Sequence, residues 1–549
     1  MKGTEVKPLS ILKLLDFVKN HHVAIPEFQR GFVWKERQVK DLFDSLVKKY
    51  PIGSIIIWKT RQKIDARTLD GEDLPRERYL VLDGQQRLTS LYYLCRQQVF
   101  AQGRVKVKFH ESCDRSVNQL IDFEKFIIVK NDKGRPELKR PKEYSGKFDL
   151  GKFEKIIGKY KFPLIIIDLD KYSDAIVVFE RINQAGTRLA TESIFLSETW
   201  NTRTQFGKIL KKWKMDNAKY PSSKIDTIIF IHTFALIFQL RYRNKVGRTV
   251  EVGVRNLKRI AVFVRDDSTD KYNRLFFDCV CAVGKAVDYL ITNFNIYKLG
   301  DLPSQTMLTV LSVYFYFKEG NHTAHQMREL KKWFWRSSIT NRYIGSGYNQ
   351  NIGPDAEQMQ ELADHDRSLK LPPVTKPELS EFKGIDLRTG RSTLRNLIKL
   401  ALWSSKPTFI NNQEVKPQDI ESQHSMPQYD HFYPSNLLKK GIGEENINNI
   451  LNLHYLDKPT NVRKYEKLPS VWLEQEIKKL KPTSNAVKKY FKSELLPFES
   501  LSDVKKFEKG LFQKRIKSRK EAFEKIYTRF LKQRHRLFLD VLEKMQKGN

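Results

Sequence analysis

Two stretches of this chain carry side chains whose types and spacing could do chemistry. In the first, YLVLDGQQRLTSLYYLC, a carboxylate, two amides and a guanidinium follow one another between Asp83 and Arg87. The apolar run before Asp83 is typical of a buried strand, Asp-Gly is a turn dipeptide, and apolar residues recur at helical spacing from Leu88 onward. The polar residues should therefore occupy a turn and the first turn of a helix. Unpaired backbone N–H groups and the positive end of the helix dipole favour an anion there.

The same residue types suit a phosphate site. Arg87 has a planar guanidinium that can bind phosphate, and Asp83 could hold a metal ion or orient a water molecule. Upstream, IPEFQRGFVW places Gln29 and Arg30 among aromatic side chains just after Pro26. A plainer interpretation stays open, because Asp-Gly is a common turn and Gln and Arg are ordinary exposed helix residues.

The second stretch combines an Asp-His pair with two downstream asparagines. QYDHFYPSNLL contains Asp430 and His431, and ILNLHYLDKPTNVRKYEK contains Asn452 and Asn461, which are nine positions apart. Cutting a phosphodiester needs an activated water, a metal ion on the phosphate and a proton for the leaving oxygen. His431 is the candidate general base, since imidazole exchanges protons near neutral pH. Asp430 and Asn461 offer the hard oxygen atoms that Mg²⁺ or Mn²⁺ prefers.

This second pattern resembles an HNH, or His-Me finger, nuclease: a strand ending in Asp-His, a second strand with an Asn, and a helix with another Asn. The resemblance implies four catalytic residues, which are Asp430, His431, Asn452 and Asn461. It places Asp430 and Asn461 on the metal and assigns Asn452 to holding the geometry around His431. We expect the neighbouring His454 and Asp457 to be exposed polar residues. The alternative is that the Asp-His pair is structural.

The first stretch also resembles a known family. IPEFQRGFVW followed by LVLDGQQRLTSL is similar to the N-terminal domain of GmrSD-type, modification-dependent restriction endonucleases, and FERINQAGTRL resembles a third block of it. The resemblance implies a ParB/sulfiredoxin-like fold that hydrolyses a nucleoside triphosphate, GTP or ATP, with Asp83 and Arg87 as catalytic residues. The implied nucleotide-binding residues are Gln29, Arg30, Asp83, Gly84, Gln85, Gln86, Arg87, Asn183 and Gly186. Because no Walker A pattern is present, this site would not be of the P-loop kind. The same family closes with an HNH nuclease.

The composition favours a nucleic-acid partner. The 549 residues include 99 Lys and Arg against 64 Asp and Glu, which gives a net charge of +35. We therefore expect double-stranded DNA as the polyanion, although codon bias in an AT-rich genome would also enrich lysine. The four cysteines lack zinc-ribbon spacing. The N-terminus lacks a signal-peptide pattern, and the apolar stretch 225–240 is too short and too polar to span a bilayer. We expect a cytoplasmic protein with no membrane contact, in which 225–240 is a buried helix.

The elements that must position these residues change in type along the chain. Strands are expected at 54–58 and 163–168 and an amphipathic helix at 11–18, which indicates an α/β or α+β domain. A strand at 126–129 is expected to pair with 105–109, and 131–147 should form a loop. Helices dominate beyond residue 191. Within them, WFWRSSITNRYIGSG resembles a block in the helical part of the same family, and Arg342 in this block is too polar for core packing.

The expected fold class is a multidomain α/β (α+β) protein. We expect four parts: a ParB/sulfiredoxin-like domain at 1–190, a helical domain at 191–405, a ββα-metal HNH nuclease at 406–480, and a basic helical segment at 481–549. The last segment has an apolar face beside many Lys and Arg residues, which suits a packed helix with one DNA-facing side.

The sequence therefore predicts a two-site enzyme. An N-terminal NTPase would sense or gate, and a C-terminal nuclease would nick or cut phage or modified DNA as part of restriction and anti-phage defence. Homo-oligomers or partner defence proteins would fit such a system. Two alternatives remain: an NTP-binding, ParB-like DNA-binding regulator, and an NTPase that acts through a partner and carries an inactive nuclease domain.

Overall fold

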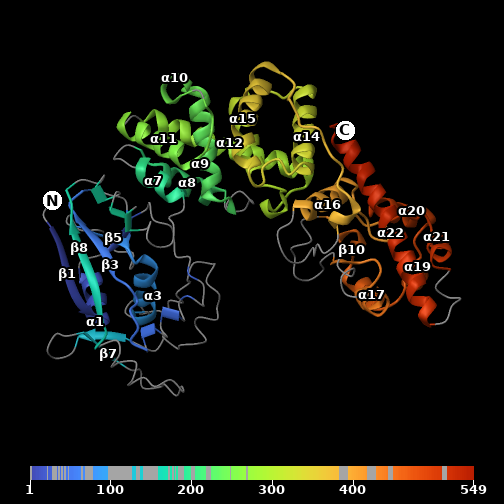
Figure 1. Ribbon diagram of the computed structural model, residues 1–549, viewed down its shortest axis with the longest axis horizontal. Coiled ribbons are helices and arrows are strands. Elements are labelled where there is room, and N and C mark those ends of the chain that lie inside the picture. The colour runs from blue at the N-terminus through green and yellow to red at the C-terminus, as the bar shows by residue number, and fades with distance from the viewer. Residues whose placement is uncertain are drawn as a thin grey trace. The chain divides into compact units, whose positions relative to one another are not determined.

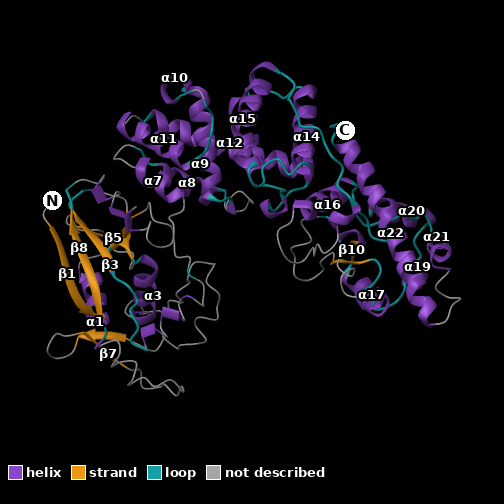
Figure 2. Ribbon diagram, in the orientation of Figure 1, coloured by secondary structure: helices purple, strands orange, loops and turns teal. Residues whose placement is uncertain are grey.

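The computed structural model of the chain divides into two units. The first comprises Met1–Ile209 and Lys258–Asn273, and the second comprises Leu210–Leu257 and Arg274–Asn549. The structure describes residues 3–20, 23–26, 34, 38, 41–42, 45–46, 48–62, 66–68, 78–96, 127–130, 136–139, 159–170, 174–175, 178–179, 181–182, 191–199, 204–217, 224–247, 249–267, 270–382, 393–416, 428–442, 449–509 and 516–548. Strands dominate the first unit and helices the second (Figures 1 and 2).

The first unit is built on a mixed sheet, whose strand order among the described residues is β1-β8-β3-β5-β2-β4. The central strands are β8 (Lys161–Asp168), β3 (Ile55–Thr60) and β5 (Arg78–Asp83). β3 runs parallel to β8 and antiparallel to β5. The short strands β2 (Ala24–Pro26) and β4 (Ala66–Thr68) extend the β5 side. The strands expected around 54–58, 79–82 and 163–168 are confirmed as β3, β5 and β8.

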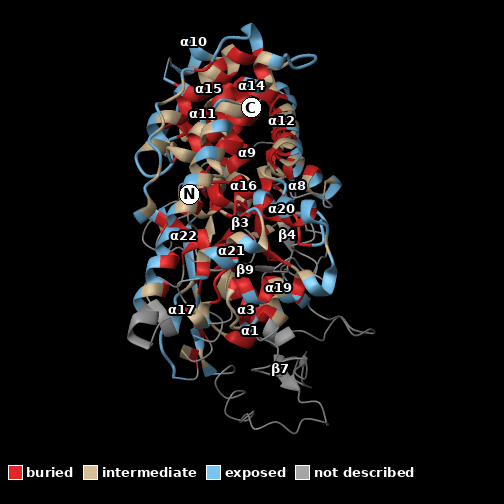
Figure 3. Ribbon diagram, turned by 90° about the vertical axis from the view of Figure 1, so that its right-hand side faces the viewer, coloured by how far each residue is buried: buried red, intermediate tan, exposed pale blue. Residues whose placement is uncertain are grey.

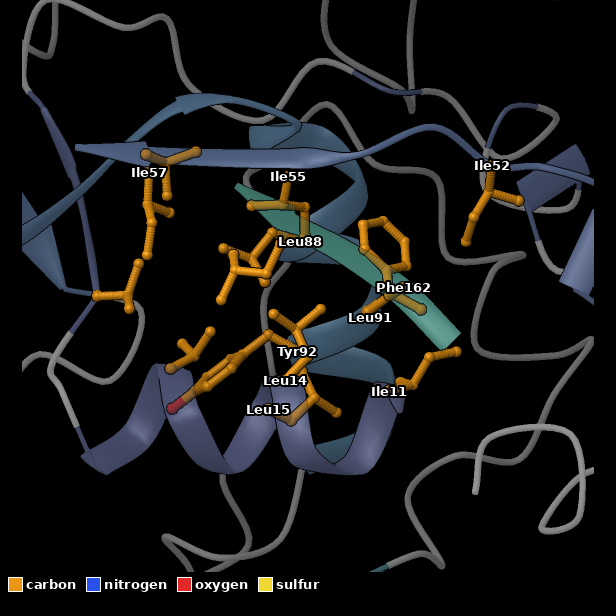
Figure 4. Packing of buried hydrophobic residues seen from close by; sticks show 14 of the residues in the cluster. Ile11, Leu14, Leu15, Ile52, Ile55, Ile57, Leu88, Leu91, Tyr92 and Phe162 are labelled. Carbon is orange, nitrogen blue, oxygen red and sulfur yellow. The ribbon is translucent and has the colours of Figure 1, made fainter. Parts of the chain in front are cut away.

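Both faces of this sheet are covered by apolar side chains. On one face, α1 (Ile11–Asn20) and α3 (Gln85–Arg96) pack against the strands (Figure 4). On the other face, Trp58 and Leu82 pack with Phe179 from the helical residues between 174 and 182. A strand buried on both faces needs a continuous apolar run rather than an alternating one. That requirement explains the sequence IIIW in β3, in which Ile55 to Trp58 are all buried.

Two strands of the first unit differ from the sequence-based expectation. The edge strand β1 (Gly3–Ser10) pairs antiparallel with β8, although its residues are mostly exposed and give little apolar pattern. The strand β6 (Ile127–Lys130) pairs with β7 (Pro136–Lys139), so the loop expected over 131–147 contains a strand. The expected partner at 105–109 lies outside the described residues. Pairing between segments so close in the chain has a small loop-closure cost, which favours the hairpin of β6 and β7.

The second unit is mostly helical. Its α9 (Thr227–Arg241) confirms the buried helix expected over 225–240, since all residues from 229 to 240 except His232 are buried (Figure 3). A helix that is apolar on all sides must be surrounded by other elements, and α9 contacts α13 (Thr306–Phe317) and α15 (Gly347–His365). The second unit also contains α10 (Arg243–Val246), α14 (Ala324–Ile339) and α16 (Thr393–Ser404). Three helices have residues in both units; they are α8 (Phe206–Asp216), α11 (Val254–Asp267) and α12 (Lys271–Phe294). α7 (Thr191–Thr199) belongs to the first unit.

The polar residue Arg342 has a structural role inside this region. Its Nε and Nη2 atoms donate to the two Asp355 carboxylate oxygens at 2.6 and 2.7 Å. The Tyr343 hydroxyl also donates to Asp355, and Trp333 Nε1 donates to Tyr343 at 3.1 Å. Arg342 is half-buried rather than part of the apolar core, and its bidentate pairing with Asp355 gives it a structural role that sequence analysis did not assign.

The C-terminal part of the second unit has a small strand pair inside a helical shell. β9 (Gln428–His431) and β10 (Leu453–Leu456) are antiparallel. The surrounding helices are α17 (Ser435–Ile442), α18 (Lys458–Lys464), α19 (Pro469–Leu480), α20 (Ser484–Ser493), α21 (Leu501–Glu508) and α22 (Ile516–Met545). Phe432, directly after β9, stacks on Phe530 of α22 with ring centroids 5.3 Å apart and meets Trp472 of α19 edge-on. α22 thus completes the core around the strand pair.

The ParB/sulfiredoxin-like and HNH assignments, and the four domain boundaries, stay predictions at this point. A mixed α/β protein, mostly helical with a small sheet, is what the structure establishes. Within the described residues, no helix combines the length and the apolar character needed to cross a membrane.

Candidate functional sites

The DGQQR stretch forms the predicted strand, turn and helix. β5 ends at Asp83, Gly84 has a φ of +84°, and α3 begins at Gln85. Gly84 fits this turn for two reasons: its φ is one that side-chain-bearing residues rarely adopt, and an added Cβ would lie 2.9 Å from Ile55 Cγ1 and 3.0 Å from the Ser54 oxygen. The first turn of α3 contains no acidic residue, so no carboxylate within that turn offsets the positive end of the helix dipole, which favours an anion.

Arg87 is held by contacts within the first unit. Its Nη1 atom donates to the Ile52 carbonyl at 2.9 Å, and its Nη2 atom lies 3.0 Å from Asp83 Oδ2. The chain comes close enough for the first contact because residue 53 is glycine: a Cβ there would lie 2.0 Å from Arg87 Nη1. Asp83 and Arg87 are both partly exposed. A phosphate at this site would therefore meet a guanidinium that already pairs with a carboxylate and a carbonyl.

A hydrogen bond joins the IPEFQRGFVW stretch to the DGQQR stretch. Trp34, which ends IPEFQRGFVW, donates its backbone N–H to Gln86 Oε1 at 3.2 Å. Gln85, the first residue of α3, is buried. Four of the predicted nucleotide-binding residues lie outside the described residues; they are Gln29, Arg30, Asn183 and Gly186.

The Asp-His pair forms the last two residues of β9 and lies opposite the first two residues of β10. In the register of the two strands, His431 is opposite Leu453 and Asp430 is opposite His454. His431 is nearly buried, and its Nδ1 atom lies 3.4 Å from Asp430 Oδ1. Asn452 immediately precedes β10, and α18 with Asn461 follows it. Strand, strand and helix thus occur in the order that the HNH resemblance implies.

Asn452 fixes the chain just after His431. It is fully buried, its Oδ1 atom accepts the Tyr433 N–H at 2.9 Å, and its Nδ2 atom donates to the Tyr433 carbonyl at 2.9 Å. The Phe432 N–H also donates to the Asn452 carbonyl. The Asn452 side-chain amide thus pairs with the Tyr433 main chain as a neighbouring strand would, and it links the chain after β9 to the chain before β10. Both polar atoms of the side chain are therefore already hydrogen-bonded within the protein.

Lys464 joins α18 to the Asp-His pair. Its buried ammonium lies 2.8 Å from Asp430 Oδ2 and also donates to the His431 carbonyl. Burial lowers the pKa of Lys464, and the Asp430 charge opposes that shift. Burial also acts to raise the pKa of the Asp430 carboxyl, but the hydrogen bond from His431 and the Lys464 charge outweigh it and hold that pKa well below its usual range. Asp430 is therefore ionised at neutral pH, as a metal ligand must be.

Asn461 lies on the same side of α18 as Lys464. The two residues are three positions apart, so their side chains are neighbours on the helix surface. Asn461 is half-buried, and its neighbour Lys464 contacts Asp430. The helix is held in place by Asp457, whose carboxylate accepts the Thr460 N–H at 2.8 Å as an N-cap, and by Arg463, which forms an ion pair with Glu476.

The expectation that His454 is an exposed polar residue is wrong. His454 is fully buried, its Nδ1 atom lies 2.8 Å from the Tyr490 hydroxyl, and burial lowers its pKa well below normal. Phe432 and Trp472 surround its ring. The physical reason is that helices cover both sides of β10, so neither face of this strand reaches solvent. Asp457 is half-buried as a helix cap rather than exposed.

Sequence reasoning did not single out two residues that the structure places beside this site. Lys464 could have been found, since it follows Asn461 by three positions. Arg534 gave no local signal: it lies on α22, is fully buried, and donates to the Leu451 carbonyl at 2.6 Å and the Glu494 carbonyl at 2.9 Å. Leu451 directly precedes Asn452, so this guanidinium supports the asparagine from a distant part of the chain.

The donor set suits Mg²⁺ or Mn²⁺ better than zinc. Within the described residues, no three His, Cys, Asp or Glu side chains are grouped to hold a metal ion. One carboxylate and one amide oxygen, as offered by Asp430 and Asn461, match the way Mg²⁺ is often held, with few protein ligands and with water and phosphate completing the shell. These two side chains would fit an ion whose remaining ligands are water molecules and a substrate phosphate.

Comparison with known proteins bears on the N-terminal part and on the whole length. Residues 11–200 match the family described as GmrSD restriction endonuclease, N-terminal domain. This match covers β2 to β8 and the DGQQR turn, and it supports the GmrSD-type resemblance. An uncharacterized protein of Methanocaldococcus jannaschii is 24% identical in an alignment that covers 96% of this chain and 97% of that protein. The alignment extends over nearly the whole length of both proteins.

Proposed function

We propose that the chain is a metal-dependent DNA endonuclease of a restriction-type defence system, with an HNH site in the second unit and a nucleotide site in the first. The match of residues 11–200 to a restriction endonuclease domain points to a defence-type function with DNA as substrate. The observation that carries the nuclease assignment is the β9–β10–α18 arrangement, in which Lys464 of α18 contacts both members of the Asp430-His431 pair.

In this proposal, the residues of the second unit divide the work of phosphodiester hydrolysis. Asp430 and Asn461 hold Mg²⁺ or Mn²⁺, which when bound polarises the scissile phosphate and stabilises the leaving oxygen. His431 takes the proton from the attacking water. Asn452 and Lys464 hold the backbone and the carboxylate so that these groups keep their positions. The high positive charge of the chain provides attraction for the DNA backbone.

The nucleotide site in this proposal uses the N-terminus of α3. A GTP or ATP phosphate would lie at the N-terminus of α3, where the helix dipole favours an anion, and Arg87 would turn from its present partners toward it. Asp83, released from Arg87, would orient the metal or the attacking water. Nucleotide turnover would then license or restrain DNA cutting. The DNA of phage, or DNA that carries a modification, is the proposed target, and a homo-oligomer or partner proteins would complete the system.

The test measures plasmid nicking and phosphate release on the same preparations, with Mg²⁺ or Mn²⁺ and with or without GTP and ATP. His431→Ala should lose roughly 100- to 10,000-fold in nicking, the usual contribution of a general base, and should keep nucleotide hydrolysis. His365→Ala is the matched control, because His365 is exposed at the end of α15. Nicking by His431→Ala at the wild-type rate would reject the HNH assignment.

An inactive nuclease domain is the second candidate, and one observation favours it. Lys464 places an ammonium on one carboxylate oxygen of Asp430, which leaves only Oδ1 for a metal ion. In that case the chain would be an NTPase acting through a partner, or a ParB-like DNA-binding regulator. Hydrolysis or DNA binding without metal-dependent nicking under any of the conditions above would identify this alternative.

A further inference from the structure

Two apolar side chains protrude beside the predicted nuclease site. Val462 and Tyr465 are 70% and 71% exposed, the highest values among the large hydrophobic residues of the described chain. Val462 directly follows Asn461, and Tyr465 directly follows Lys464. Isolated exposed apolar residues need no explanation, but these two are neighbours on one helix end and both adjoin residues assigned to the site.

The backbone at Tyr465 is strained. Its φ is +43° and its ψ is −122° at the end of α18, a conformation that a bulky L-residue rarely adopts. The residues on both sides hold it there: Lys464 is fixed by Asp430 and His431, and the Lys467 N–H donates to the Lys464 carbonyl at 3.0 Å. Strain that the surroundings maintain is concentrated at ligand-binding and active sites. Glycine would satisfy this backbone without cost, so the aromatic ring calls for a reason outside folding.

The charges nearby identify the kind of partner. Lys458 at the start of α18 and Lys467 just after it are the cations that this segment can offer to phosphates, because Arg463 pairs with Glu476 and the buried Lys464 pairs with Asp430. An exposed aromatic ring within a basic segment is the usual combination for contact with nucleic-acid bases, because the cations neutralise phosphates while the ring stacks on a base or enters a base step. The net charge of +35 on the whole chain also favours a polyanion over a protein partner of ordinary composition.

We propose that Tyr465, supported by Val462, inserts against the bases of duplex DNA beside the phosphate that is cut, and so fixes the strand on the Asp430-His431 pair. The contact rests on the proposed nuclease function, since its position matters only if DNA is cut there. The strained backbone turns the ring outward from the end of α18, and the anchored Lys464 keeps that direction. The ring therefore contributes to DNA affinity and strand positioning rather than to stability.

The experiment uses the full chain with His431→Ala as the parent, so that DNA is bound without being cut. Fluorescence anisotropy measures affinity for a labelled duplex, and 2-aminopurine within the duplex reports loss of base stacking. Tyr465→Gly should weaken binding by roughly tenfold, the order expected for one lost stacking contact, and should abolish the 2-aminopurine change. Tyr465→Phe should preserve both signals. Phe277→Ala, at a 42% exposed ring on α12, is the matched control and should bind as the parent does.

The same substitutions in the active chain complete the test. Tyr465→Gly should raise the KM for plasmid DNA with little change in kcat at saturation, and its apparent Tm should equal or exceed that of the wild type because glycine relieves the strain. Unchanged affinity and unchanged KM for Tyr465→Gly would overturn the inference. A change in oligomeric state with unchanged DNA affinity would assign the surface to a second copy and would also overturn it. Absence of nicking by the wild type rejects the nuclease function, whereas the anisotropy result reports on Tyr465 independently.

Discussion

Replacing Lys464 by methionine tests whether α18 holds the Asp-His pair in place. The Lys464 side chain is 2% exposed, and its ammonium lies between Asp430 Oδ2, at 2.8 Å, and the His431 carbonyl. Methionine keeps the length and apolar volume of the stem and removes the charge. The carboxylate and the carbonyl would then both lose their partner, while the helix itself would lose no backbone hydrogen bond.

The expected cost follows from how exposed the two partners are. Removing one member of a fully buried ion pair costs about 3–5 kcal/mol, because the other charge is left without compensation. The Asp430 side chain is 28% exposed and keeps its contact with His431, so water can replace part of the lost interaction. We therefore expect a loss of about 2–3 kcal/mol in the free energy of unfolding. A displacement of about 1 Å in the Asp-His pair would lower nicking by roughly 100-fold.

Thermal unfolding and nicking as a function of Mg²⁺ concentration measure both effects. Lys458→Met, at an exposed position in the first turn of the same helix, is the control and should change stability by less than about 0.5 kcal/mol. Asp430→Asn in combination with Lys464→Met should cost less than the two single changes added together, since both remove the same interaction. If Lys464→Met unfolds like Lys458→Met and nicks like the wild type, or if the double variant is strictly additive, the positioning argument is refuted.

Three further predictions concern other parts of the chain. Gly53→Ala should destabilise the first unit by more than about 1 kcal/mol, because the new Cβ would displace Arg87 from Ile52 and would have to adopt φ +80°; Gly207→Ala, where a Cβ meets nothing within 4 Å, is the control in the same thermal melt. Burial raises the pKa of Glu494 from 4.5 to about 8, so the protonated form that stabilises the fold is present at low pH and is lost as the pH rises toward 8. Glu494→Gln should therefore reduce the fall in apparent Tm between about pH 5 and 8.5. Glu508, whose pKa burial raises to about 7, should account for the pH dependence that remains. Exchanging the exposed Lys525 and Lys532 of α22 for Gln should lower the slope of log affinity against log salt by roughly 2 if both contact phosphates, and an unchanged slope would remove this face of α22 from the DNA footprint.

The C-terminal helix shows why truncation would be a poor test of DNA binding. Residues 481–549 were expected to form a separate basic segment, and deletion of the last part would seem a simple way to remove charge. Phe530 and Tyr527 of α22, however, pack on Phe432 and Tyr433 beside the Asp-His pair, and Arg534 supports the chain before Asn452. Deleting α22 would open the core of the predicted nuclease, so single exposed lysines are the better probes.

The sequence by itself determined the local structure of both candidate sites. The strand, turn and helix around Asp83-Gly84 and the buried helix α9 follow from neighbouring residues, whereas the order of β9, β10 and α18 was implied by the resemblance to HNH nucleases. Apolar periodicity and turn chemistry act over a few positions, so they can be interpreted without knowing the rest of the fold. The resemblance of the DGQQR block to the GmrSD N-terminal domain was likewise contained in a short segment, and the match of residues 11–200 supports it.

Only the tertiary structure decided which polar residues form hydrogen bonds or ion pairs with other parts of the protein. Arg87 pairs with a carbonyl 35 positions earlier in the chain, Lys464 reaches back to Asp430, and Arg534 reaches 83 positions to Leu451. The same long-range packing buries His454, which its sequence context suggested would be exposed. A charged side chain has the same local pattern whether it faces water or a distant partner. Its role is settled by the desolvation that folding imposes and by the group that compensates for it.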